Sequence, residues 1–310
     1  MSGRTPTVAW IGCGTMGEPM AKHLLQAGYA LVVVPHRHEE AIHRLVESGA
    51  MRVETAAEAA STVDLVFTMV PDAPQVEEVL FGAKGIVAGA HPGLTVIDCS
   101  TIAPQAARRF ADRLQEAGIA FLDSPVSGGQ SRARSGTLTL MVGGSEEVFL
   151  PVQPVLQAFA EKIFYVGPVG SGQVVKMCNN LIGAILVLAN SEALTLGVKE
   201  GVPAELLREV IGTATGANYQ LEQIWPENVL QNRYTPGFKL DLMYKDLGIA
   251  LSSADASGVP LFAGALARQL YQFARSNGLG EQDYSVVSTV YQQAAGILIA
   301  TSKPYPIDKA

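Results

Sequence analysis

The first half of the chain alternates short apolar runs with amphipathic segments. TVAWI at residues 7–11 leads into a group of glycines, and residues 16–29 then carry apolar side chains at helical spacing. Further apolar runs rich in β-branched residues follow at intervals that leave room for a helix between them. These runs are ALVVV at 30–34, VDLVFTMV at 63–70, LTVIDCS at 94–100, IAFLDSPVSGG at 119–129, TLTLMVGG at 137–144 and KIFYVG at 162–167.

Repeated alternation of strand and helix predicts an α/β fold with a doubly wound parallel sheet of the Rossmann type. The pattern changes after Gly172, where residues 173–201 and 241–258 have helical period and few strand signals. We therefore expect two domains, a Rossmann domain over residues 1–166 and an all-α domain over residues 167–310.

Composition restricts the class of function. The chain has 48% hydrophobic and 16% charged residues, which indicates extensive burial rather than disorder. Its net charge of −7 argues against nucleic acid or an anionic membrane as the main partner. Three widely separated cysteines suggest neither a disulfide framework nor a metal site, and residues 1–14 lack the long apolar stretch of a secretory signal. The longest apolar run, residues 181–189, is too short to cross a bilayer, so we expect a cytoplasmic protein.

Gly12, Gly14 and Gly17 form the pattern G-x-G-x-x-G, directly after the first predicted strand and at the start of the first predicted helix. Without side chains in the way, backbone N–H groups and the positive end of the helix can meet the pyrophosphate of a dinucleotide. The motif therefore predicts a cofactor loop, and an ordinary tight turn is the alternative. The residues between the glycines, which belong to the same predicted loop, are Cys13, Thr15 and Met16.

The end of the second predicted strand bears on the choice between NAD and NADP. An acidic residue there, about 20 residues beyond the first glycine, would bind the 2′-hydroxyl of NAD. This chain instead has Pro35, His36, Arg37 and His38. An arginine can pair with the 2′-phosphate of NADP through charge-assisted hydrogen bonds. We expect NADP to be favoured, with His36 and Arg37 as ligands; a solvated loop charge at Arg37 is the alternative.

Moving a hydride off a carbinol carbon leaves a proton on oxygen, so such an enzyme needs an acid/base nearby. All five histidines lie in the predicted Rossmann domain. A lysine can serve when its surroundings lower its pKa, and Lys176 lies in the most apolar predicted helix. Asn180 follows four residues later and so shares its helix face. A lysine that snorkels to water at a helix start is the alternative.

Four motifs follow one another along the chain: GCGTMG at residues 12–17, DSPVSGG at 123–129, G-x-x-x-K-x-x-N-N at 172–180 and KDL at 245–247. In order and approximate spacing they resemble the β-hydroxyacid dehydrogenase family over nearly the whole chain. This family includes 3-hydroxyisobutyrate dehydrogenase and tartronate semialdehyde reductase. The resemblance implies hydride transfer between a nicotinamide cofactor and a small β-hydroxy acid or its aldehyde or keto acid.

The resemblance also implies roles for individual residues. Lys176 would be the general acid/base and Asn180 a ligand of the substrate. Ser127, Gly128 and Gly129 would hold the substrate carboxylate. Two successive glycines allow close backbone approach and can present N–H groups to an anion. From the residues alone, SPVSGG is a plain turn.

Further cofactor contacts are implied at two predicted strand ends and at one lysine. In this fold the ends of parallel strands face the ligand. Ordinary strand ends and a surface ion pair of the lysine are the alternatives, and Asp246 is expected to be a structural partner. The residues are Met69, Val70, Pro71, Thr101 and Lys245.

The stretch after the glycine pair departs from the family pattern of small residues. Gln130, Arg132 and Arg134 can face solvent or widen anion recognition, which leaves the substrate open. An imine reductase-like NADPH enzyme has a related fold but usually carries another residue in place of Lys176. A non-catalytic nucleotide-binding module would not need Lys176 and Asn180 together. The apolar helices after residue 180 offer more hydrophobic surface than a small domain buries, so we expect a homodimer or homotetramer.

Overall fold

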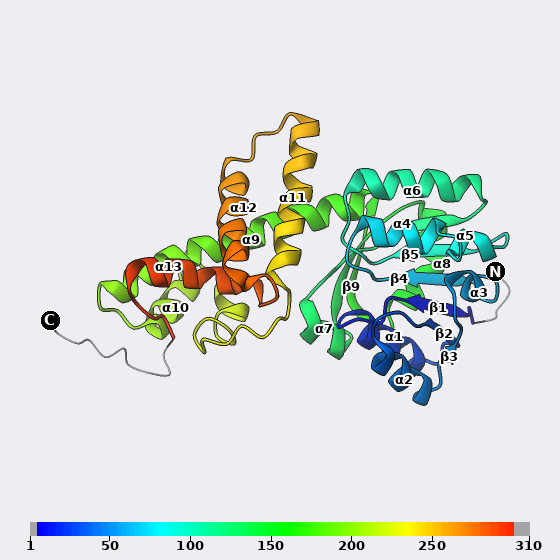
Figure 1. The fold of residues 1–310 in the computed structure, drawn as a ribbon, viewed down its shortest axis with the longest axis horizontal. Helices are drawn as coiled ribbons and strands as arrows, with labels where there is room; N and C mark the ends of the chain where they lie inside the picture. Colours follow the sequence, from blue (N-terminus) through cyan, green and yellow to red (C-terminus); the bar gives the residue numbers. More distant parts are fainter. Residues whose placement is uncertain (1–4, 301–310) are drawn as a thin grey trace. The chain divides into compact units, whose positions relative to one another are not determined.

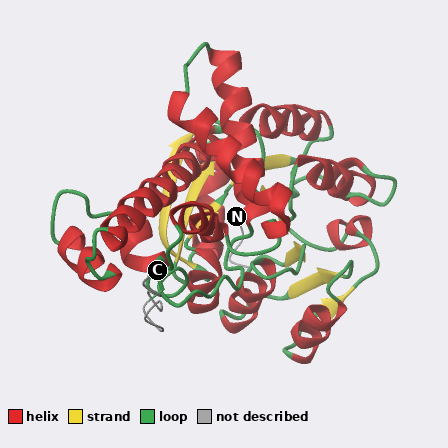
Figure 2. Cartoon of the chain, turned by 60° about the vertical axis from the view of Figure 1, so that its left-hand side comes forward, coloured by secondary structure: helices red, strands yellow, loops and turns green. Residues whose placement is uncertain are grey.

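The computed structural model describes residues 5–300, which divide into two compact units. The first unit ends at Lys176 and the second begins at Met177. The described strands all belong to the first unit, and the second consists of helices and loops (Figure 1; Figure 2). The sequence pattern puts this change at residues 166/167. The division lies somewhat later because the first turns of helix α9 (Ser171–Lys199) are hydrogen-bonded to the first unit.

Within residues 5–300 the sheet of the first unit has nine strands, in the order β3-β2-β1-β4-β5-β6-β8-β7 with β9 paired to β8. Their bounds are β1 (Val8–Ile11), β2 (Leu31–Val34), β3 (Met51–Arg52), β4 (Leu65–Thr68), β5 (Thr95–Asp98), β6 (Ala120–Asp123), β7 (Val126–Ser127), β8 (Leu138–Gly143) and β9 (Ala160–Gly167).

Strands β1 to β6 run parallel in the order 3-2-1-4-5-6 that is typical of dinucleotide-binding folds. The sequences VAWI, LVVV, LVFT and TVID are buried along their whole length, as strands covered on both faces must be. The order of connection reverses between β1 and β4. In folds of this kind ligands bind outside the carboxyl ends of the strands at that point.

The last part of the sheet departs from the all-parallel prediction. IAFLDSPVSGG, expected as one strand, forms both β6 and the short β7, and β8 pairs antiparallel to each of them. The short helix α7 (Gly129–Ser135) follows β7 directly. The chain therefore returns along the sheet without the long crossover that a parallel neighbour requires. β9 then pairs parallel to β8.

Helices cover both faces of the sheet (Figure 1). One apolar cluster joins α1, α2, α7 and α8 to one face, and another joins α3 to α6 to the other. The bounds are α1 (Gly17–Gln26), α2 (Glu39–Glu47), α3 (Ala56–Ala60), α4 (Ala73–Phe81), α5 (Ile86–Gly89), α6 (Pro104–Glu116), α8 (Glu146–Leu156), α10 (Ala204–Gly212), α11 (Leu240–Ser257), α12 (Phe262–Ala274) and α13 (Ser288–Ala295), with the helical turns η1 (Gln220–Ile224), η2 (Arg275–Leu279) and η3 (Tyr284–Val287).

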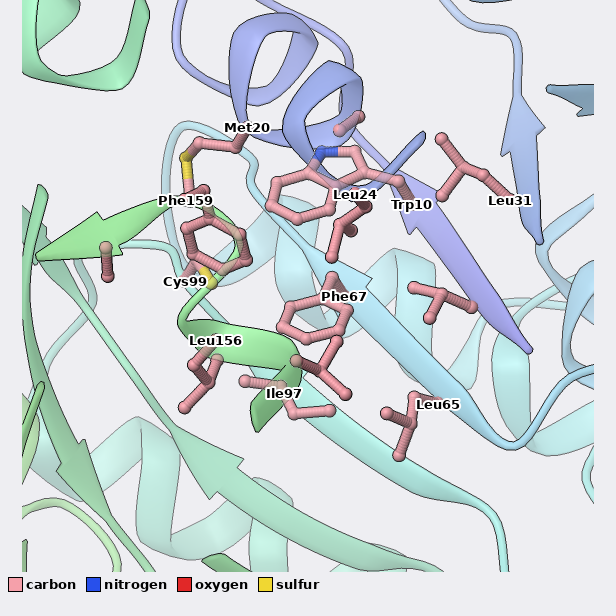
Figure 3. Close-up of a cluster of buried hydrophobic side chains, with 14 of the residues drawn as sticks. Trp10, Met20, Leu24, Leu31, Leu65, Phe67, Ile97, Cys99, Leu156 and Phe159 are labelled. Carbon is pink, nitrogen blue, oxygen red and sulfur yellow. The ribbon is translucent and has the colours of Figure 1, made fainter. Parts of the chain in front are cut away.

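Three aromatic rings form the centre of the first cluster (Figure 3). Trp10 on β1 stacks on Phe67 on β4 with ring centroids 5.3 Å apart. Phe159 meets both rings edge-on, at 5.8 and 5.9 Å. All three are completely buried, and a methyl group on Gly17 would lie 2.8 Å from Nε1 of Trp10. The glycine loop after β1 therefore rests directly on the aromatic core.

The second unit has its own core, in which α9, α11 and α12 pack together. Buried residues of this core include Val187 on α9, Leu247 on α11 and Tyr271 on α12. By length and composition α9 would also suffice to cross a membrane. However, 44% of its most apolar stretch is buried within the protein, and long core helices meet the same criterion.

Candidate active site

The three glycines after β1 have different neighbours. A methyl group on Gly12, which has φ +99°, would overlap the carbonyl oxygen of Met69. One on Gly17 would overlap the carbonyl oxygen of Gly12. At Gly14 the nearest atoms lie 3.7 Å away, in the ring of His38. Packing thus requires glycine at two positions, whereas the backbone at Gly14 keeps the clearance that a dinucleotide pyrophosphate needs.

The residues between the glycines point in different directions. Cys13 is buried and Met16 packs against the same core, while Thr15 is exposed. Burial raises the pKa of the Cys13 thiol to about 12, and the charge of Glu18 adds to the rise. The Cys13 side chain therefore packs in the core beside the loop.

His38 lies beside the glycine loop. Of the segment after β2, only His36 and Arg37 were predicted from the sequence to contact the cofactor. The His38 ring is the nearest group to the space above Gly14. His36 and Arg37 follow β2 and are exposed. His38 belongs to the same short segment as His36 and Arg37. The sequence alone does not show which of these three side chains lies beside the glycine loop.

A buried polar network joins the ends of β4 and β5. Oδ1 of Asp98 accepts hydrogen bonds from the Thr68 hydroxyl at 2.8 Å and from the Ser100 N–H at 3.1 Å. The Ser100 hydroxyl in turn accepts one from the Val70 N–H at 3.0 Å. The predicted contacts Val70 and Thr101 therefore lie on two loops that are held together at the carboxyl edge of the sheet.

Asp98 is a completely buried carboxyl group. Burial raises its pKa to about 6 against the opposing effect of its hydrogen bonds, and the charge of Asp123 adds to the rise. The two residues are in register on β5 and β6. Within the described residues, Oδ2 of Asp98 has no hydrogen-bond partner.

Asp123 fastens the start of α9 to the end of β6. Its carboxylate accepts hydrogen bonds from the N–H groups of Gly170 at 2.7 Å and Gln173 at 2.9 Å. Burial raises the pKa of Asp123, and these hydrogen bonds act in the opposite direction. The positive end of the helix also favours a negative charge there. Gly172 permits this close packing, because a methyl group on it would overlap the carbonyl oxygen of Met141.

Lys176 follows on the same helix and is only 8% exposed. One turn before it, the Gln173 side chain donates to the Ser100 carbonyl at 2.8 Å and accepts from the Ile102 N–H at 3.1 Å. The turn of α9 that precedes Lys176 is thus hydrogen-bonded to the loop around Thr101 within the first unit. The sequence analysis proposed a role for Lys176 but none for Gln173, or for Asp123 at the start of the DSPVSGG motif.

Three other singled-out residues form a cluster in the second unit. Asn180 is buried, and its Nδ2 donates to Oδ2 of Asp246 at 2.5 Å. Its Oδ1 accepts from Asn179 at 3.0 Å. Oδ1 of Asp246 pairs with Nζ of Lys245 at 3.2 Å. Asp246 thus orients the Asn180 amide, which keeps one N–H outside this bond, and its other carboxylate oxygen forms an ion pair with Lys245.

The glycine pair at the start of α7 has the backbone that only glycine adopts easily. Gly128 has φ +130° and Gly129 has φ +64°. Nothing lies within 4 Å of a methyl group placed on Gly129, whereas one on Gly128 would meet the stem of Arg132 at 2.6 Å. Arg134 instead donates to Gln130 at 3.3 Å. Of the three residues that depart from the family pattern, Arg132 is therefore the one whose side chain packs beside Gly128.

Comparison with known proteins identifies the fold and the chemistry. Residues 7–167 match the NAD binding domain of 6-phosphogluconate dehydrogenase, and residues 170–291 match the NAD-binding family of NADP-dependent 3-hydroxyisobutyrate dehydrogenase. The chain is 41% identical to the NAD-dependent L-serine dehydrogenase of Pseudomonas aeruginosa over 93% of its own length and 99% of the relative's. It belongs to the β-hydroxyacid dehydrogenase family.

Two further relatives agree. The 2-(hydroxymethyl)glutarate dehydrogenase of Eubacterium barkeri is 37% identical, over 94% of this chain and 97% of the relative. A 3-hydroxyisobutyrate dehydrogenase of Mycobacterium tuberculosis, solved with L-serine, has a TM-score of 0.84 at 34% identity and covers 93% and 99% of the two chains. The dehydrogenase is therefore an NAD(P)-dependent oxidoreductase of hydroxy acids, and the family, the fold and the reaction class predicted from its motifs are confirmed.

Two glycine substitutions should separate folding from cofactor binding. Gly17→Ala is expected to destabilise the protein strongly, because its methyl group overlaps the backbone. Gly14→Ala should change the free energy of unfolding by only about 1 kcal/mol or less. It should nevertheless weaken NAD(P) binding at least about tenfold, because the methyl group occupies the pyrophosphate's approach. Thermal unfolding and calorimetric cofactor titration measure the two effects, and unchanged affinity in Gly14→Ala would place the cofactor elsewhere.

Asp98→Asn is expected to alter how the free energy of unfolding depends on pH. Folding raises the pKa of this carboxyl group from its ordinary value of 3.8 to about 6. Its stabilising contribution is therefore complete below about pH 4 and is lost as the pH rises through about 6. Asparagine stays neutral, so the variant should gain about 3 kcal/mol relative to the wild type between about pH 4 and pH 7.

Urea unfolding at a series of pH values measures this difference. Asp112→Asn, on the exposed surface of α6, is the matched control and should follow the wild-type pH profile. A stability difference between Asp98→Asn and the wild type that does not vary with pH would contradict the expectation.

Proposed function

We propose that the dehydrogenase transfers a hydride between the nicotinamide and the hydroxyl-bearing carbon of a short β-hydroxy acid, with Lys176 as general acid/base. The observation that carries this proposal is the buried position of Lys176, one turn after the Gln173 side chain that bonds the loop around Thr101. An amine shielded from bulk water can exchange a proton with a substrate oxygen without competition from solvent.

Each step of the proposed mechanism assigns a task to the protein. The bound nicotinamide supplies or accepts the hydride. In oxidation, the neutral Lys176 amine takes the hydroxyl proton as the hydride leaves the carbon; in reduction, its ammonium form returns that proton to the carbonyl oxygen. Asn180 binds the substrate through the N–H that Asp246 leaves unused. Ser127 and the N–H groups of the glycine pair hold the substrate carboxylate.

The names of the relatives suggest the substrate class. L-Serine, 3-hydroxyisobutyrate and 2-(hydroxymethyl)glutarate each carry a primary alcohol on the carbon next to the one that bears the carboxylate. We propose a substrate of this hydroxymethyl acid type, or its semialdehyde. A carboxylate held at Gly128 and Gly129 would put the rest of the substrate near Arg132, whose stem packs beside Gly128.

NADP is the proposed preferred cofactor. No acidic residue follows β2 before Glu39, and Arg37 is exposed there. The first relative named above is NAD-dependent, which makes NAD the alternative to measure. The proposed contacts of the cofactor beyond the glycine loop are His36, Arg37, Met69, Val70, Pro71, Thr101 and Lys245.

The cellular location and the oligomeric state of the dehydrogenase are also proposals. All three cysteines are free thiols, which supports the reducing cytoplasm. Ile182 and Leu196 on α9 and Phe262 on α12 are large and exposed, at 59%, 63% and 85%, which supports self-association into a homodimer or homotetramer. Light scattering would reveal a monomer if this is wrong.

Lys176→Ala is expected to lower kcat on the order of 10²–10⁴-fold and to leave NAD(P) affinity nearly unchanged, because the proton has no acceptor while the cofactor loop is intact. Lys199→Ala, at the exposed end of the same helix, is the matched control and should keep wild-type turnover. Absorbance of the reduced nicotinamide gives the rates, with hydroxymethyl acids and a cyclic imine as substrates. Wild-type turnover in Lys176→Ala would refute the assignment.

Arg37→Gln tests the cofactor preference. Loss of charge-assisted hydrogen bonds to the 2′-phosphate should lower kcat/KM for NADP about 10- to 100-fold and leave the value for NAD within about twofold. Arg134→Gln, on the exposed surface of α7, controls for the loss of a positive charge. An equal effect of Arg37→Gln on both cofactors would show that Arg37 does not read the 2′ position.

A further inference from the structure

Gln173 on α9 hydrogen-bonds the end of β6 with its backbone and the loop after β5 with its side chain. It is 1% exposed, in the first turn of α9. Its N–H donates to Asp123 at the end of β6. Its side-chain amide donates to the Ser100 carbonyl and accepts from the Ile102 N–H in the loop after β5.

The two side-chain bonds lie on either side of Thr101. Ser100 and Ile102 are its chain neighbours, so the Gln173 amide closes a short ring around the backbone of the residue proposed to contact the cofactor. A neutral amide is suited to this place because it offers a donor and an acceptor at once. A methionine of similar size offers no N–H and a carboxylate would repel the Ser100 carbonyl.

The same helix carries the amine. Lys176 follows Gln173 by three residues and so lies on the same helix face. Both side chains are buried, and both belong to the first unit. The close packing of Gly172 on β8 and the hydrogen bonds that Asp123 accepts hold this end of α9 against the sheet. Any shift of the loop relative to this turn of α9 would have to break a Gln173 hydrogen bond.

We propose that Gln173 is a positioning residue, which sets the separation between the Lys176 amine and the cofactor loop at Thr101. The inference rests on the proposed function of Lys176 and adds to it a residue that touches neither substrate nor cofactor. Hydride and proton transfer require the reacting groups within a few tenths of an ångström of their productive positions. A misplacement of about 1 Å can cost about 10²-fold in rate.

The test compares Gln173→Met with Gln292→Met. Gln292 is a matched control, because it is also a buried amide that accepts from a backbone N–H, that of Ile299 at 2.9 Å, and donates to a hydroxyl, that of Ser288. Both variants should lose similar stability in urea. Gln173→Met should lower kcat about 10- to 100-fold, change KM little and raise the primary deuterium isotope effect on kcat, whereas Gln292→Met should keep kcat within about twofold.

A second readout needs no turnover. In the protein without added cofactor, hydrogen exchange of the Ile102 amide, followed by mass spectrometry of peptides that span residues 99–103, should be faster in Gln173→Met and unchanged in Gln292→Met. If Gln173→Met does not fold, Gln173→Ala leaves space for water to replace the amide and takes its place in every measurement.

Equal rate losses in the two glutamine variants, in proportion to their stability, would overturn the inference. So would wild-type kcat in Gln173→Met. Measuring Lys176→Ala in the same series distinguishes failure of the Gln173 inference from failure of the proposed function. Active Lys176→Ala refutes the role of the amine itself, whereas inactive Lys176→Ala with fully active Gln173→Met refutes only the role of Gln173.

Discussion

One buried carboxylate governs the arrangement of the proposed site. A negative charge in the interior is costly unless hydrogen bonds compensate it, and Asp123 obtains two from the backbone at the positive end of a 29-residue helix. This contact joins the end of a central strand to the start of α9. The amine on that helix is consequently placed by the sheet, the same element that shapes the cofactor loop.

The rest of the carboxyl edge extends this contact into a continuous polar network. Asp98 accepts a hydrogen bond from Ser100, and Ser100 accepts one from the loop after β4. The Gln173 amide on α9 bonds the two residues on either side of Thr101. Such networks stabilise one arrangement of the backbone, since each broken bond leaves a buried polar group without a partner. The loops proposed to contact the cofactor are thereby held in one arrangement by the protein itself.

Local patterns along the chain were enough to predict the central strands, the glycine loop and the long apolar helix. VAWI, LVVV, LVFT and TVID are buried strands because their apolar residues leave no polar face. The direction of β8 and the existence of α7 were missed, because periodicity specifies the type of an element and not its partner. The family motifs supplied Lys176, which physical reasoning alone left open.

The missed site residues share one property. Gln173 lies 73 positions from the carbonyl group that it binds, and Asp123 lies 47 from its first donor, so neither contact leaves a periodic trace. An acidic residue at the end of an apolar run, as in AFLD and TVID, was the available hint. A buried carboxyl group there demands a partner, but the sequence does not say which one.

The continuity of α9 has a practical consequence for dissecting the enzyme. The most compact division of the chain falls between Lys176 and Met177, within an uninterrupted helix that begins at Ser171. Expressing the two halves separately at that point would break the main-chain hydrogen bonds of α9 that cross the cut. Each fragment would then end in part of a helix whose terminal N–H or C=O groups lack partners. A dissection that follows the architecture would have to leave the helix whole, so that the nucleotide-binding half is produced with a long apolar tail attached.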